Sequence, residues 1–146
     1  FIASEIVEKG PSLEARYKAY SVLTGREIFS ASFKVSADTV RGTAHGIADS
    51  IYRAMTGKPS IFSSKIVFVS DRTTVKKSDN MKELYIMDFD GRRVEKLTNF
   101  NSMVISPSVS PDNSKIMFSL ISAHKETSRN RVRSIKNIDL KMYDLR

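Results

Sequence analysis

The segment SPSVSPDNSKIMF, residues 106–118, decides how the second half of this chain folds. Two Ser-Pro pairs lead into a Pro-Asp-Asn turn, and a run of β-favouring residues, KIMF, follows the turn. Asn113 stands at a turn position where Asn tolerates the left-handed backbone conformation. Because neither this segment nor its flanks repeat apolar residues with a helical period, they predict β-structure interrupted by tight turns.

The β-rich half of the chain that surrounds this segment contains an internal repeat. KIMF at 115–118 matches KIVF at 65–68 with an offset of 50 residues, and DLKMYD at 139–144 matches ELYIMD at 83–88 with an offset of 56. The two features recur in the same order, and their offsets are close to the roughly 40 to 50 residues of a propeller blade. The repeat therefore predicts all-β propeller blades, with a second connector six residues longer than the first.

The second copy stops before the segment that follows the first copy at residues 91–98. One and a half blades cannot close a ring, because each blade covers both of its faces with neighbouring blades. The sequence is therefore expected to be a fragment of a longer protein, an incomplete propeller whose second blade has an unpaired edge.

The first part of the chain has a different pattern. Residues 13–22 and 26–35 read as two strands of a hairpin turned at Thr24-Gly25, and residues 40–55 carry one apolar stripe at helical spacing. Ser36 or Asp38 is expected to cap this helix and Gly57 to end it. The expected fold is a small α+β portion, a β-hairpin plus a helix that lies on it, over residues 1–58. The propeller portion follows, with a first blade at 59–102 and a partial second blade at 103–146.

Charge separates the same two parts. The chain has a net charge of +8, with seven basic and six acidic residues before residue 58 and 17 basic and ten acidic residues from there on. The absence of cysteine excludes disulfides and thiolate metal sites, and the mean hydropathy of −0.27 comes with no apolar run long enough to span a bilayer. The basic excess predicts an acidic partner for the second part.

The turn segment resembles the S-P-x-W-S-P-D-G-x-K-I-x-F signature of propellers in the TolB family and in prolyl-oligopeptidase-like peptidases, with Val109 and Asn113 at the aromatic and glycine positions. The first part favours the TolB family: YSVLTG at 20–25, FKV at 33–35 and AHGIADSIYRAMTG at 44–57 resemble the end of its N-terminal domain. The resemblance begins near Ser12 and is weakest in the basic connectors.

The resemblance implies a non-enzymatic periplasmic protein of the Tol/Pal envelope system, without a cofactor. Such proteins bind the Pal lipoprotein through the propeller and TolA through the N-terminal region, support outer-membrane integrity and envelope constriction at division, and are exploited by some bacteriocins. No family contact residue maps onto this chain. Two alternatives stay open: the propeller of a peptidase, which a hydrolase elbow downstream would favour, and a basic polyanion-binding module.

The candidate partner-binding residues lie in the two basic connectors between matching strands. They are Arg72, Lys76, Lys77, Arg129, Arg131 and Arg133. Ordinary solvated loops are the favoured interpretation of both connectors, and contact with an acidic protein or an anionic envelope surface is the alternative. Nucleic acid is not expected, because neither connector has an aromatic residue for stacking on bases.

The other candidate polar residues are better explained by structural roles than by metal binding or catalysis. His45 and Asp49 are spaced for two metal ligands on the helix, but a polar outer face explains both. Five aspartates at strand ends predict turn capping rather than a calcium loop, namely Asp71, Asp88, Asp90, Asp112 and Asp144. No G-x-S-x-G elbow occurs, so no catalytic residue, metal ligand or cofactor-binding residue is predicted.

Overall fold

The computed structural model describes residues 1–10, 12–74, 80–128 and 131–145. The chain forms two compact units, Phe1–Ser64 and Lys65–Arg146. The first unit contains three strands and the single helix of the described residues, and the second contains six strands. Within the described residues, the one helix is too short and too polar to cross a lipid bilayer.

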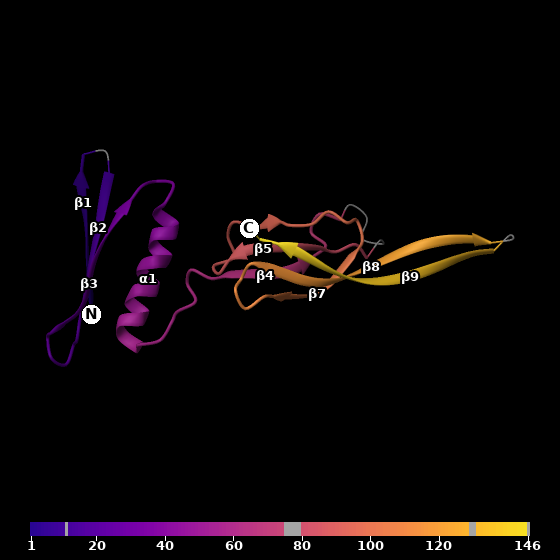
Figure 1. Ribbon diagram of the computed structural model, residues 1–146. Helices are drawn as coiled ribbons and strands as arrows, with labels where there is room; N and C mark the ends of the chain where they lie inside the picture. Colours follow the sequence, from indigo (N-terminus) through magenta and orange to yellow (C-terminus); the bar gives the residue numbers. More distant parts are fainter. Residues whose placement is uncertain (11, 75–79, 129–130, 146) are drawn as a thin grey trace. The chain divides into compact units, whose positions relative to one another are not determined.

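The first unit is a three-stranded antiparallel sheet with a helix beside it (Figure 1). The predicted hairpin is confirmed as β2 (Ser12–Tyr20) and β3 (Glu27–Val35). An additional strand, β1 (Ile2–Lys9), pairs with β2 along its whole length and was not predicted. Most of the described β1 side chains are exposed, so this strand is held by backbone pairing and lacks the apolar alternation that would reveal it in the sequence.

The predicted helix is confirmed as α1 (Val40–Thr56), which contacts β3. Its N-cap residue is Thr39 rather than Ser36 or Asp38, and the Thr39 side chain does not cap the helix: its Oγ1 accepts a hydrogen bond of 3.1 Å from the Ser36 backbone N–H, which lies before the helix. Gly57 ends the helix as predicted, in the left-handed conformation (φ 68°), and its N–H donates to the Arg53 carbonyl. The apolar stripe is buried most deeply at Ile47.

The segment after the helix is attached to it. Asp49 Oδ1 accepts hydrogen bonds from the Ser60 hydroxyl and, at 3.0 Å, from the Phe62 backbone N–H. The Phe62 ring also meets Tyr52 edge to face at 6.1 Å. Because these contacts tie residues 60–62 to α1, the compact units divide between Ser64 and Lys65 rather than at the Pro-containing turn itself.

The second unit consists of two three-stranded antiparallel sheets. The first has the order β4 (Lys65–Ser70), β5 (Glu83–Asp88) and β6 (Glu95–Lys96). The second has the order β7 (Met103–Val109), β8 (Lys115–Ser128) and β9 (Arg131–Asp144).

The register confirms the internal repeat. Lys65 pairs with Asp88 in the first sheet, and Lys115 pairs with Asp144 in the second, so both members of the pair are displaced by the offsets seen in the sequence. The two sheets are unclosed blades of a propeller.

One apolar core joins the two sheets. Leu84 of the first sheet is fully buried with Val104, Ile116 and Phe118 of the second, and Val67, Val69, Leu97, Tyr143 and Leu145 pack around them. Burial of a side chain of this size contributes about 1.5 to 3 kcal/mol. The face of each blade that carries these residues is therefore fixed by its neighbour.

The turn segment has the geometry that its residues predict. Pro107, which has no N–H, lies where the β7–β8 register shifts between Ile105 and Ser108, and Asn113 has a φ of 56°. Asp112 caps the turn by accepting from the Ser110 hydroxyl (2.6 Å) and from the Ser114 hydroxyl (2.7 Å). These hydrogen bonds favour the ionised carboxylate and lower the pKa of Asp112 to about 2.

The second connector was predicted as a loop, but it is a two-stranded ribbon. β8 and β9 continue beyond Met103, the first residue of β7, and pair from Ile121↔Ile138 out to Ser128↔Arg131 (Figure 1). The prediction was wrong because this segment mixes charged, polar and apolar residues without alternation. Residues 134–138 of the ribbon are exposed, and a strand that buries neither face needs no alternation to form.

Candidate functional site

Both connectors emerge at the same end of the second unit, where they border a groove of about 640 Å³. We call this hollow the connector groove. It is lined by Asn80 and Met81 of the first connector, by residues 100–103 before and at the start of β7, by residues 121–123 of β8, and by Lys136 and Ile138 of β9. It therefore combines apolar side chains with amides and a cation.

A backbone bridge between the sheets positions the groove. Lys82, just before β5, pairs in parallel with Met103 at the start of β7. The Lys82 N–H donates to the Ser102 carbonyl at 2.9 Å, and the Val104 N–H donates to the Lys82 carbonyl at 3.0 Å. These bonds hold the first connector against the entry of the second sheet.

A buried carboxylate supports the same junction. Glu83 is only 4% exposed, and its Oε2 accepts from the Thr98 hydroxyl at 2.6 Å while its Oε1 accepts from the Asn101 N–H at 2.8 Å. Thr98 Oγ1 in turn accepts from the Leu84 N–H at 2.9 Å. Sequence reasoning missed Glu83. The only available signal was a charged residue at the start of an otherwise apolar strand.

Arg72 is the predicted partner-binding residue whose side-chain contacts are described. Its guanidinium lies 5.2 Å from the Phe68 ring centre and 5.3 Å from that of Tyr85, and these two rings stack at 5.6 Å. Thr73 and the Tyr85 hydroxyl share a hydrogen bond of 2.7 Å. Arg72 stays exposed on its outer side, so the cation is held in a fixed place by the aromatic pair.

The other five candidates are placed unevenly. Arg131 and Arg133 lie in β9, in register with Ser128 and Glu126 of β8. Lys76, Lys77 and Arg129 lie outside the described residues. Arg72 belongs to the base of the first connector, whereas Arg131 and Arg133 belong to the outer half of the ribbon. The partner-binding role of all six stays a prediction.

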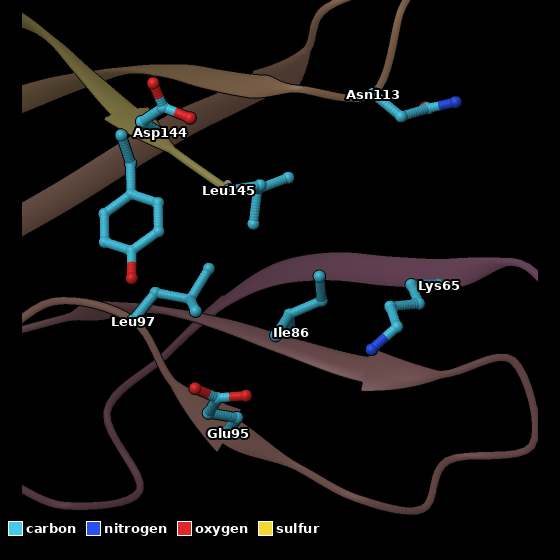
Figure 2. A pocket seen from close by; sticks show the side chains of 8 residues that line it. Lys65, Ile86, Glu95, Leu97, Asn113, Asp144 and Leu145 are labelled. Carbon is cyan, nitrogen blue, oxygen red and sulfur yellow. The ribbon is translucent and has the colours of Figure 1, made fainter.

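A second hollow of about 350 Å³ lies at the opposite end of the seam between the two sheets. Figure 2 shows Asp144 and Leu145 on one side of it, opposite Ile86, Leu97 and Glu95 of the first sheet. Lys65, Asn113 and Tyr143 complete its lining, which therefore carries one lysine and two carboxylates.

The two ends of the second unit differ in charge. The connectors, residues 71–82 and 122–137, contain nine basic and three acidic residues, whereas the remainder of residues 65–146 contains seven of each. The net positive charge of the unit therefore belongs to the connector end. A one-sided positive potential of this kind favours the approach of negatively charged groups.

The polar groups with possible metal roles have structural partners. Asp49 binds the linker and Asp112 its own turn, and Asp88 accepts from Arg93 Nε at 2.6 Å. In the part of the chain that the structure describes, no three His, Cys, Asp or Glu side chains gather into a metal-binding group.

Comparison with known proteins identifies the family. Residues 52–140, more than half of the chain, match the family described as "TolB beta propeller domain". This chain belongs to the TolB β-propeller family. The match spans both sheets and begins inside α1.

Individual TolB proteins are similar over both units. The chain is 37% identical over 119 residues to the Tol-Pal system protein TolB of Ruegeria sp. (strain TM1040), and 34% identical over 101 residues to the protein TolB homolog of Chlorobium chlorochromatii (strain CaD3). These alignments cover 80% and 69% of this chain but only 26% and 22% of the relatives. An alignment of 119 residues exceeds the length of the second unit, so the likeness to TolB extends into the first.

A solved TolB structure agrees with the fold. The crystal structure of TolB from Acinetobacter baumannii matches with a TM-score of 0.71 and 25% sequence identity, covering 99% of this chain and 33% of that one. The chain thus spans about a third of that TolB structure, and it has the fold expected from the resemblance.

Proposed function

We propose that this chain is part of a non-enzymatic, periplasmic scaffold of the Tol/Pal envelope system. The observation that carries the proposal is the match to the TolB β-propeller family, supported by similarity to proteins named as Tol-Pal system proteins. In this role the propeller presents its loops to a Pal-like lipoprotein, and the first unit leads toward TolA-like machinery that supports outer-membrane integrity and division. Bacteriocins that use the system are further partners.

The connector end is the proposed contact surface on the second unit. Its nine basic and three acidic residues favour an acidic protein surface, and the connector groove supplies apolar contact area at the same end. The rest of the second unit has balanced charge and the hollow at the opposite end is smaller, which makes that end the weaker candidate.

The test is binding of the full 146-residue chain to the soluble domain of the Pal-like lipoprotein from the same source, measured by calorimetry. We expect saturable binding, weakened about tenfold when Arg131→Glu and Arg133→Glu are combined, because reversed charges repel an acidic surface. The matched control combines Arg92→Glu and Lys115→Glu, which reverse two charges outside the connectors and should leave the affinity unchanged. Equal affinities of the two double variants would rule out the connector end.

Titration with duplex DNA distinguishes the scaffold proposal from the alternative of a polyanion-binding module. Phosphate contacts release counterions and make binding fall steeply with salt. We expect no saturable DNA binding at 150 mM salt, a concentration of about the physiological level. Tight, steeply salt-dependent DNA binding without binding of the lipoprotein would replace the scaffold proposal.

A further inference from the structure

Among the residues that the structure describes, one edge of β8 has no paired strand along the ribbon. β7 pairs with β8 only as far as Met103↔Ile121, whereas β9 follows the opposite edge of β8 to Ser128↔Arg131 (Figure 1). Along residues 123–128, no described strand pairs with the edge of β8 that β7 occupies further back. In an antiparallel strand every second residue directs its N–H and C=O groups to each side, so this edge offers a hydrogen-bonding ladder.

The connector groove lies at Met103, the first residue of β7. Met103 and residues 121–123 line it, so an extended chain placed in the groove would continue the line of β7 along β8. Met81 and Phe100 supply apolar surface in the same hollow, and Asn80 and Asn101 supply amides. Together, the groove and the edge of β8 have the two features of a site where a peptide binds as an added strand: a backbone edge that no described strand occupies, and a hollow that accepts alternate side chains of the peptide.

Charge selects the occupant. The free edge belongs to the second connector, and the groove is lined by residues of both connectors, whose nine basic and three acidic residues produce a positive field. Lys136 is exposed at the rim of the groove and lies in register with Ala123, the first residue of the free edge. A basic peptide would be repelled, and an acidic one would gain favourable contacts along its length.

We propose that the β8 edge and the connector groove bind an extended acidic peptide segment of a partner protein, which adds as a strand in line with β7. Apolar residues of the peptide enter the groove while its acidic residues face the basic connectors. The proposal rests on the proposed function only for the class of partner, a protein. It adds the chemistry of the recognised segment and the place where it binds.

The test uses synthetic peptides and the full chain. The probe is the capped octapeptide Asp-Val-Glu-Ile-Asp-Val-Glu-Leu, long enough to cover six residues at about 3.3 Å each. One control peptide has Lys at the four acidic positions. Two further control peptides carry backbone N-methyl groups, one on the odd-numbered residues and the other on the even-numbered residues. We expect the acidic peptide to bind at least about tenfold more tightly than either kind of control, because the Lys peptide is repelled and the N-methylated peptides cannot form the ladder.

Hydrogen exchange locates the binding site. The acidic peptide should slow amide exchange at those alternate residues of 123–128 whose N–H groups face away from β9, and leave the region of the turn at 110–114 unchanged. Protection elsewhere, or equal affinity of the N-methylated peptides, would overturn strand addition. Protection of these same alternate residues before peptide is added, together with a dimer in sedimentation, would show that a second copy of the chain occupies this edge instead.

Matched variants test the charge argument. Lys136→Glu should weaken the acidic peptide by about five- to tenfold, because it places a like charge at the rim. Lys115→Glu, an exposed lysine at the far end of the same strand pair, should not change the affinity. Equal affinities of the two variants would contradict the proposed site. If the lipoprotein fails to bind while the peptide results hold, the proposed function fails and this inference stands.

Discussion

At the scale of single residues, buried polar groups organise the junction between the two sheets. Glu83 joins β5 to the segment that enters β7, because its two oxygens accept from Thr98 and Asn101. The Lys82–Met103 bridge lies next to it. A carboxylate that is 4% exposed is stable there only because its oxygens have hydrogen-bond donors. The shape of the connector groove therefore depends on a residue outside its lining.

Replacement of this carboxylate should destabilise the second unit. Glu83→Gln places an amide NH₂ where the Thr98 hydroxyl or the Asn101 N–H donates, so one buried donor loses its acceptor. We expect the free energy of unfolding to fall by about 1 to 3 kcal/mol in urea denaturation. Glu95→Gln changes an exposed carboxylate on the neighbouring strand and should have almost no effect. A loss shared equally by both variants would count against the buried network.

At the scale of secondary-structure elements, local sequence signals and the structure agree where the signal is confined to a few residues. Gly57 ends α1 because its φ of 68° is accessible to glycine at little cost. Asn113 and Pro107 likewise occupy a left-handed turn position and a bulge. By contrast, the ribbon formed by β8 and β9 has no local signal, because pairing across the hairpin rather than burial defines it.

Two glycines of the helical segment should respond in opposite directions. Gly57→Ala forces a side chain into the left-handed region and should lower the stability of the first unit by about 1 kcal/mol. Gly46→Ala lies inside α1 with open space around the new Cβ and should raise it by about 0.5 to 1 kcal/mol. Thermal unfolding followed by circular dichroism measures both. The same sign for both variants would disprove the assigned helix end.

At the scale of the whole molecule, the chain divides into two compact units. The residues that connect them are not a free linker, because Asp49 and Tyr52 hold residues 60–62 on α1. Asp49 was weighed in the sequence as a metal ligand or as part of a polar helix face. Its contacts with Ser60 and Phe62 give it a third role, which depends on the chain returning to the helix.

Loss of this carboxylate should expose the connection to proteolysis. In Asp49→Ala, residues 60–62 lose two hydrogen bonds to the helix, so chymotrypsin should cleave after Phe62 several-fold faster, by roughly the factor expected for about 1 kcal/mol of lost local stability. Mass spectrometry of timed digests identifies the cut. Asp38→Ala, an exposed acidic residue before the helix, is the control. Unchanged cleavage in Asp49→Ala would show that this carboxylate does not hold the segment.

Short-range chemistry in the chain is sufficient to predict the repeat, its offsets and the turns that bound it, because the matching strands and the turn residues are each recognised within a few positions. The family is predicted by the resemblance of these same segments to known sequences. Tertiary structure alone decides which groups donate hydrogen bonds to Glu83, how far β8 and β9 stay paired, and that the groove lies at the start of β7. The partners of Glu83 and the position of the groove arise from contacts between segments far apart in the chain, and the length of the ribbon arises from pairing across a hairpin. Neither kind of contact leaves a periodic pattern in the sequence.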